Sequence, residues 1–143
     1  KEETFVCGCG KCGHLEQYAS ATGIVRKARQ VLETSDQPSM LREAAYLSCK
    51  EVFDCAKKGD DLSLQILDFV GDQLGNACAM ISGVFDPEIY VIGGGVSKAG
   101  DILIDTVREH FKKYAFHAST NAEFVLATLG NDAGMYGAVK MVL

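Results

Sequence analysis

The feature that most constrains the fold is a strand–helix–strand order in the second half of the chain. Residues 89–92 (IYVI) form a short apolar run rich in β-branched side chains, and three glycines at 93–95 end it, which is typical of a buried strand. Apolar spacing predicts a helix over 101–114, a second strand over 123–129 and a last helix over 133–141. A strand, a helix and a strand in this order form a right-handed parallel crossover, so this half of the chain predicts an α/β unit.

The first half of the chain is predicted to be mostly helical. Apolar residues recur at three- and four-residue steps over 15–33, with a break expected at Thr22 and Gly23. A second helix is expected to begin near Ser48, whose hydroxyl can cap it. The longest helix is predicted over 62–82. Glycines in and beside it cost helix propensity, and we expect them to allow the close approach of another backbone: Gly71, Gly75 and Gly83.

Three cysteines and a histidine fall within eight residues near the start of the chain: Cys7, Cys9, Cys12 and His14. Thiolates and imidazoles are the preferred ligands of structural zinc, and the intervening glycines let a short chain wrap around one ion. A redox pair is an alternative, but such a pair is expected at a helix start after a strand, which this region does not offer. The third alternative is a turn without a metal. The spacing favours a zinc loop, held either by these four residues or with one ligand from upstream of Lys1.

The other cysteines and histidines have plainer interpretations. The remaining cysteines lie in apolar helical patterns, where cysteine acts as a small hydrophobic residue, so we expect burial of all three: Cys49, Cys55 and Cys78. His110 and His117 have no acidic or thiol partner at metal-ligand spacing. Both are predicted to be surface or packing residues.

Two further segments could contact ligands. Glu16 follows the cysteine cluster at the start of a helix, where a carboxylate interacts favourably with the helix dipole. The sharper interpretation is that a metal-held loop fixes this carboxylate so that it accepts hydrogen bonds from a polyol. The second segment is the turn Gly93, Gly94, Gly95, Val96 and Ser97, which lies between a strand and a helix. It matches neither GxGxxG nor a P-loop, so a nucleotide-contacting turn and a tight packing turn both remain open.

The net charge and the overall composition narrow the class of protein and its possible partners. The net charge of −5 and the sequence pI of about 5.1 argue against binding to nucleic acid or to anionic membranes. No apolar run reaches the roughly 20 residues that a membrane helix needs, and no signal-peptide pattern opens the chain. A cytoplasmic protein is therefore expected. Because the cysteine cluster has little chain before it to pack on, we also expect these 143 residues to be part of a longer protein.

Taken together, these segments resemble the ROK family (repressor, open reading frame, kinase) of sugar kinases, in particular its bacterial glucokinases. The zinc motif CxCGxxGCxE of that family corresponds to CGCGKCGHLE at 7–16. Four further segments match in the same order: QYASATGIVRKAR at 17–29, AKKGD at 56–60, DPEIYVIGGGVSKAGDIL at 86–103 and LGNDAGMYGAVK at 129–140. The resemblance covers essentially the whole chain.

The resemblance implies an actin-like, ribonuclease-H-type α/β fold of two lobes with the active site between them. Residues 1–143 would be the carboxy-terminal lobe, with the zinc and sugar-binding loop at 1–16 and the adenosine side at 86–143. The amino-terminal lobe would supply the phosphate-binding DxG loop and the aspartate that acts as general base, and no candidate for either occurs in this chain. The implied activity is phosphorylation of glucose by ATP with Mg, which this lobe alone would not catalyse.

The resemblance also implies roles for single residues. Glu16 would contact sugar hydroxyls, and the 93–97 turn would be the adenosine motif. The zinc would be structural and would hold the loop that presents Glu16. Dimers or tetramers of identical chains are implied as well.

The sequence departs from the family motif at one position. His14 stands where the family has its third cysteine, and Cys12 occupies a variable position. Either residue could complete the site, since histidine is a competent zinc ligand. The remaining ligand of the family is an upstream histidine. Three alternatives to a glucokinase stay open: a ROK transcriptional repressor, a kinase for another hexose such as fructose or an N-acetylated amino sugar, and a zinc-stabilised interaction module.

Overall fold

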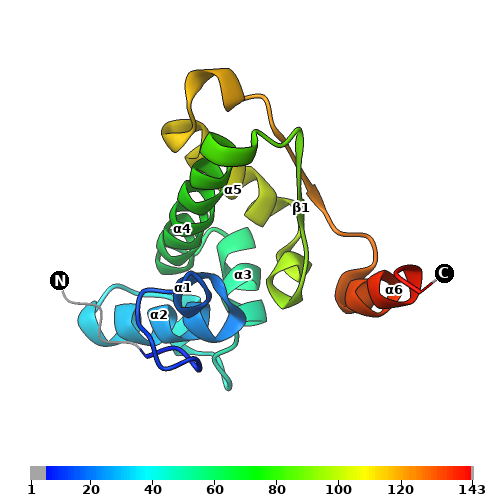
Figure 1. The fold of residues 1–143 in the computed structure, drawn as a ribbon. Coiled ribbons are helices and arrows are strands. Elements are labelled where there is room, and N and C mark those ends of the chain that lie inside the picture. The colour runs from blue at the N-terminus through cyan, green and yellow to red at the C-terminus, as the bar shows by residue number, and fades with distance from the viewer. Residues whose placement is uncertain (1–5, 143) are drawn as a thin grey trace.

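The fold is a mainly helical assembly with one small parallel sheet (Figure 1). The computed structural model describes residues 6–142, apart from the side chain of Asn131. In chain order the elements are α1 (Glu16–Ala19), α2 (Ala21–Thr34), η1 (Met40–Arg42), α3 (Cys49–Lys57), α4 (Asp61–Phe85), β1 (Ile89–Ile92), η2 (Gly95–Ala99), α5 (Asp101–Tyr114), η3 (His117–Ser119), β2 (Glu123–Leu126), η4 (Gly130–Asp132) and α6 (Ala133–Lys140). The predicted α/β class is confirmed.

The sheet has the predicted parallel order. β1 pairs with β2 in parallel, with Ile89 opposite Glu123 and Ile92 opposite Leu126, and α5 connects the two strands. The prediction that the second strand extends to residue 129 is wrong. The N–H of Ala127 still donates to the carbonyl of Ile92 at 2.9 Å, but β1 ends there and offers no further partner. β2 therefore stops where its neighbour turns away.

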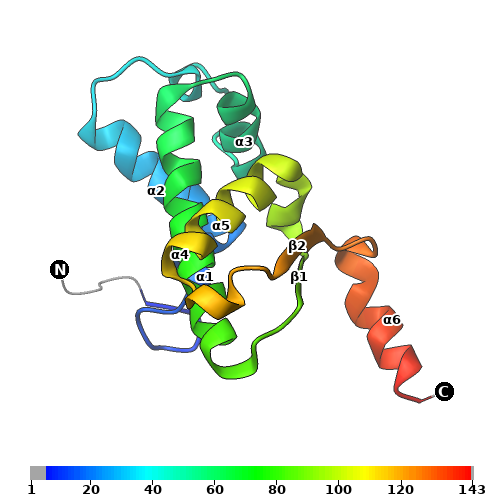
Figure 2. The ribbon, with the colours of Figure 1, turned by 90° about the horizontal axis from the view of Figure 1, so that it is seen from above.

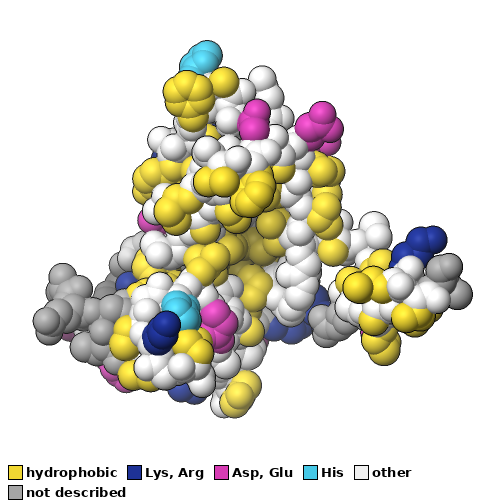
Figure 3. Space-filling model, viewed as in Figure 1, with side chains coloured by type: hydrophobic (Ala, Val, Ile, Leu, Met, Phe, Trp, Pro, Cys, Tyr) yellow, Lys and Arg dark blue, Asp and Glu magenta, His cyan; other side chains and the backbone are white. Residues whose placement is uncertain are grey.

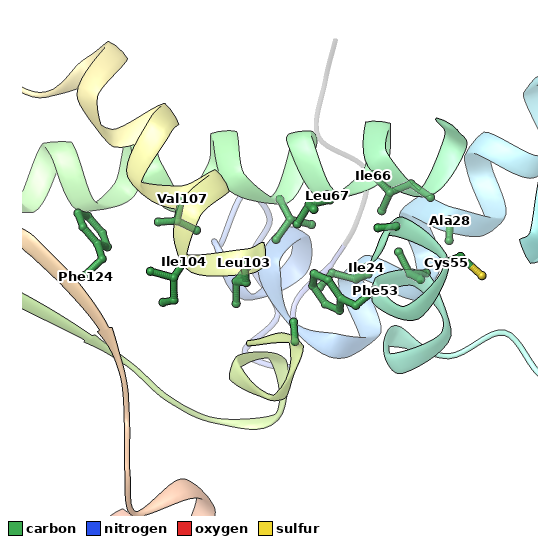
Figure 4. Packing of buried hydrophobic residues seen from close by; sticks show 14 of the residues in the cluster. Ile24, Ala28, Phe53, Cys55, Ile66, Leu67, Leu103, Ile104, Val107 and Phe124 are labelled. Carbon is green, nitrogen blue, oxygen red and sulfur yellow. The ribbon is translucent and has the colours of Figure 1, made fainter. Parts of the chain in front are cut away.

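The core forms where α4 and α5 lie side by side and the amino-terminal helices close over one end (Figure 2). Figure 4 shows Ile24, Phe53, Leu67 and Leu103, which come from α2, α3, α4 and α5 and point toward one another. All four side chains are at most 3% exposed. Burial of this apolar surface is the main force that holds the helices together.

Two of the glycines of α4 explain how closely α5 approaches. A Cβ at Gly71 would lie 2.4 Å from Cγ2 of Thr106, and one at Gly75 would lie 2.6 Å from the backbone N of Phe111. The prediction of close backbone approach is confirmed at both positions. It is wrong for Gly83, where a Cβ would meet nothing within 4 Å.

The first two helices meet at a tight corner that the sequence placed two residues too late. The break lies at Ser20, whose side chain caps α2 by accepting from the N–H of Gly23 at 3.1 Å. Gly23 is inside the first turn of α2, and a Cβ there would lie only 2.5 Å from the carbonyl oxygen of Gln17. This glycine permits a close contact and does not end a helix.

The predicted cap of α3 is confirmed, whereas the burial predicted for three cysteines holds for two of them. Ser48 caps α3 by accepting from the N–H of Glu51 at 3.1 Å. Cys55 and Cys78 are buried, whereas Cys49 is only half-buried. Burial raises the pKa of the Cys49 and Cys78 thiols to about 11 each. Among the described residues, no helix combines the length and apolar character needed to cross a membrane.

The last helix stands apart from the rest of the molecule. Figures 1 and 2 both show α6 beyond the end of β2, away from the helical core. None of its described side chains is buried, and several are large and apolar: Met135, Tyr136 and Val139. Asp132 makes no side-chain cap to this helix.

Candidate functional site

The cysteine cluster forms a loop closed by its own backbone. The N–H of Cys7 donates to the carbonyl of Lys11 at 2.8 Å, and the N–H of Gly10 donates to the carbonyl of Cys7 at 2.8 Å. Val6 and Cys12 form an isolated antiparallel bridge. Gly10 has a φ of +84°, a conformation that a residue with a Cβ rarely adopts. The glycine-rich spacing is thus what lets the chain double back within so few residues.

Three of the four predicted metal ligands converge inside this loop. The ligand atoms of Cys7, Cys9 and His14 all lie within 4.8 Å of one another, and Sγ of Cys9 is 3.4 Å from Nδ1 of His14. Cys12 is exposed and is not part of this group. The sequence left open whether His14 or Cys12 belongs to the site. In the structure, His14 is part of the cluster and Cys12 lies outside it.

The local electrostatics suit a cation. The backbone N–H of Cys9 and hydrogen bonding with His14 both lower the pKa of the Cys7 thiol, which favours the thiolate form that binds metals. Two thiolates and an imidazole match the donors of structural zinc, which is usually four-coordinate. Cys7, Cys9 and His14 thus fit three of the four ligand positions of such a site.

Glu16 lies directly beside this loop. It is the first residue of α1 and is exposed, and its Oε2 is 3.9 Å from Sγ of Cys7. The same oxygen accepts a hydrogen bond from Nε2 of Gln17 at 2.5 Å. Since α1 has only four residues, its dipole is a minor reason for a carboxylate at this position. The contacts with the loop and with Gln17 define where this carboxylate points.

Glu16 and the glycine turn line one cleft. This Glu16 cleft has a volume of about 450 Å³ and is lined by Glu16, Gly93, Gly95 and Val96, backed by Leu74 of α4 and Leu103 of α5. Figure 3 shows hydrophobic side chains lining a hollow between the amino-terminal helices and the region of β1. Two segments that are far apart in the sequence therefore line the same cleft.

The glycine turn keeps an open side. Gly94 has a φ of +82°, and Oγ of Ser97 donates to its carbonyl at 2.7 Å. A Cβ at Gly94 or Gly95 would meet nothing within 4 Å, so packing among the described residues does not demand glycine there. Only Gly93 is close to a neighbour, with a Cβ position 3.2 Å from Cβ of Ala127. This pattern favours a turn that a ligand or another part of the protein approaches.

The two other histidines lie outside this cleft. His117 is exposed, as predicted. His110 is 5% exposed and is therefore a packing residue, which is one of the two predicted alternatives. It has acidic partners that are remote in the sequence: its Nε2 is 2.7 Å from Asp68 and its Nδ1 is 3.3 Å from Asp72. Asp68 lies 42 residues away in the sequence, so no local spacing could have revealed this cluster.

Sequence reasoning missed one polar residue at the site. Gln17 is buried beside Glu16, and its carbonyl Oε1 accepts a hydrogen bond from Nη1 of Arg26 at 2.8 Å. The only available signal was a polar residue that interrupts the apolar positions of 15–33. That signal is common on helices and does not identify a site.

Known proteins of two functional classes are similar to this chain. A glucokinase of Halalkalibacterium halodurans is 44% identical over 136 residues, which are 92% of this chain and 41% of that protein. The DNA-binding transcriptional dual regulator NagC of Escherichia coli is 26% identical over 140 residues, which are 96% of this chain and 34% of that protein. The chain thus spans less than half the length of these relatives.

The fold is also that of solved sugar kinases. A crystal structure of a ROK family glucokinase from Streptomyces griseus, in complex with glucose and AMPPNP, matches with a TM-score of 0.83 and 28% identity. The match covers 97% of this chain and 47% of the Streptomyces chain. The ROK family profile matches residues 1–143. The chain therefore belongs to the ROK family.

Proposed function

We propose that these residues are the carboxy-terminal lobe of an ATP-dependent glucokinase, which converts glucose to glucose 6-phosphate. The observation that carries the proposal is the Glu16 cleft, which is lined both by a carboxylate and by an open glycine turn. The 44% identity to a glucokinase and the likeness to a glucokinase bound to glucose and AMPPNP support it. Since the chain covers less than half of these relatives, the general base and the phosphate-binding loop are assigned to the part of the enzyme outside these residues.

Each wall of the cleft has its own task. Glu16 accepts hydrogen bonds from sugar hydroxyls, which orients the sugar without a covalent step. Gly93, Gly94, Gly95, Val96 and Ser97 present backbone to the adenosine part of ATP, and the absence of side chains at the glycines leaves room for it. Mg bound with the ATP would supply neutralisation of the phosphate charge.

We also propose a structural zinc in the cysteine loop. Cys7, Cys9 and His14 supply three ligands, and the fourth comes from a residue outside 6–142 or from a rearranged Cys12. Cys7, Cys9 and His14 would hold the ion, and its binding would stiffen the loop that contacts Glu16 through Cys7. Measuring the zinc content of Cys12→Ser and His14→Ala by elemental analysis tests this ligand set, because only the loss of a true ligand lowers the zinc content.

The test of the function is a substitution at Glu16 in the full-length enzyme. Glu16→Gln keeps the size of the side chain but removes its charge, so we expect the KM for glucose to rise roughly tenfold or more, as for loss of charged hydrogen bonds. The KM for ATP should stay unchanged. Both constants come from a coupled assay of glucose phosphorylation. Glu33→Gln, on the exposed end of α2, is the matched control. An unchanged KM for glucose in Glu16→Gln would refute the assignment.

A transcriptional repressor is the second candidate, because NagC covers nearly the whole chain at 26% identity. A repressor would bind operator DNA through a segment outside these residues and would show no phosphorylation of any hexose. Assaying glucose, fructose and N-acetylated amino sugars with the full-length protein separates this candidate and also identifies a kinase for another hexose.

A further inference from the structure

We infer that Gln17 is a positioning residue for Glu16, linking its carboxylate to the guanidinium of Arg26 through a short hydrogen-bond relay. Nη1 of Arg26 donates to Oε1 of Gln17 at 2.8 Å, and Nε2 of Gln17 donates to Oε2 of Glu16 at 2.5 Å. The inference rests on the proposed function of Glu16 as the sugar-binding carboxylate. It adds a residue that does not itself line the Glu16 cleft.

The burial of Gln17 argues that these bonds matter. Gln17 is 8% exposed and is one of few polar residues in the interior of the described structure. A buried amide costs free energy unless both of its polar groups are paired. Here the amide oxygen faces a cation and the amide nitrogen faces an anion, so both groups have a charged partner. The relay therefore orients the amide in one way only.

The backbone around Gln17 is fixed as well. Nη1 of Arg26 lies 3.3 Å from the backbone carbonyl of Gln17, which ties α2 to α1 a second time. Gly23 lets α2 approach this carbonyl so closely that a Cβ would lie 2.5 Å away. Ser20 caps α2 at the same corner. The helix corner thus holds both ends of the relay in register.

The relay leaves half of the Glu16 carboxylate for a ligand. Oε2 is approached from two sides, by Gln17 at 2.5 Å and by Cys7 at 3.9 Å. Among the described residues, Oε1 of Glu16 has no hydrogen-bond partner. A direct ion pair with arginine would occupy and neutralise the carboxylate, whereas an amide in between fixes one oxygen and preserves the charge. Gln17 thereby holds one oxygen of a carboxylate that lines the cleft and leaves the other oxygen available to a ligand.

The test is a double-mutant cycle in the full-length enzyme. Gln17→Met keeps the length of the side chain but removes both hydrogen bonds, so we expect glucose affinity to fall about tenfold, with ATP affinity unchanged. In a Glu16→Ala background the same substitution should change glucose affinity less than about twofold, because the residue acts through Glu16. Isothermal titration calorimetry measures both affinities. Gln30→Met, on the exposed face of α2, is the matched control.

The outcomes separate this inference from the proposed function. If Glu16→Ala leaves glucose affinity intact, the proposed sugar-binding role fails. If Glu16→Ala weakens binding but Gln17→Met does not, only the positioning role fails. The positioning role would also be overturned if Gln17→Met lowered glucose affinity by the same factor in the wild-type and Glu16→Ala backgrounds. If Gln17→Met lowers the melting temperature, Gln17→Glu is used in its place. This substitution keeps the shape of the side chain and the contact with Arg26, but it replaces the hydrogen-bond donor toward Glu16 with an acceptor. We expect an equal or larger loss of glucose affinity from it.

Discussion

At the residue scale, Asp60 shows how one carboxylate joins separate parts of the chain. It is 7% exposed, and its oxygens accept from the N–H of Met40 at 2.7 Å, the N–H of Ser63 at 3.0 Å, and the hydroxyls of Ser39 and Ser63 at 2.9 and 2.7 Å. Burial alone would raise the pKa of Asp60, but the hydrogen bonds from Ser63, Met40 and Ser39 outweigh it and lower the pKa. The charged form is therefore the one that the fold selects.

We expect Asp60→Asn to destabilise the protein by about 1–3 kcal/mol, because an amide cannot accept from all four donors. The contribution of the carboxylate is present above the ordinary aspartate pKa of 3.8 and is lost as the pH falls through the lowered folded value. The difference in the free energy of unfolding between wild type and Asp60→Asn should thus become smaller as the pH falls. Urea unfolding at several pH values measures it. A difference in unfolding free energy that grows at low pH would contradict this account. So would an equal loss of stability from Asp36→Asn, at an exposed position.

At the element scale, local chemistry was predictable and tertiary contacts were not. The cap at Ser48 and the parallel order of β1 and β2 follow from side chains and spacing within a few residues. The corner at Ser20 was misplaced because Gly23 looks like a helix breaker until its contact with Gln17 is known. For the same reason the sequence pointed to Glu16 but not to the residue that orients it.

We expect Gly75→Ala to destabilise the protein by about 1–3 kcal/mol, because the new methyl group would overlap the α5 backbone. Helix propensity alone would predict a gain of up to about 1 kcal/mol. Gly83→Ala in the same helix is the control, since its Cβ position is open, and it should show that gain. Thermal unfolding of the two variants measures the difference. Stabilisation by both substitutions would rule out the close α4–α5 contact.

At the scale of the whole molecule, the sequence outlined the site through separate motifs, and the fold showed which of them meet. Of the four predicted ligands, Cys7, Cys9 and His14 lie together, and only the loop geometry shows that Cys12 is outside this group. The joining of Glu16 to the glycine turn depends on how α1 lies against α4, which no local pattern encodes.

We expect the 143-residue chain alone to give no turnover with glucose and Mg-ATP. Phosphoryl transfer needs a positioned base and phosphate donors, which we assign to the other lobe. A coupled assay with a blank lacking protein measures this. Clear activity of the isolated chain would overturn its assignment as one lobe.

The Glu16 cleft has a consequence for the order in which substrates bind. Glu16 and the glycine turn are both backed by the α4–α5 pair, through Leu74 and Leu103. On the proposed assignment of sugar to Glu16 and adenosine to the glycine turn, neither ligand has to shape the part of the wall that binds the other, so we expect this side of the cleft to allow the two to bind in either order. A compulsory order of addition, if kinetics reveals one, would have its origin in the part of the enzyme that faces this wall.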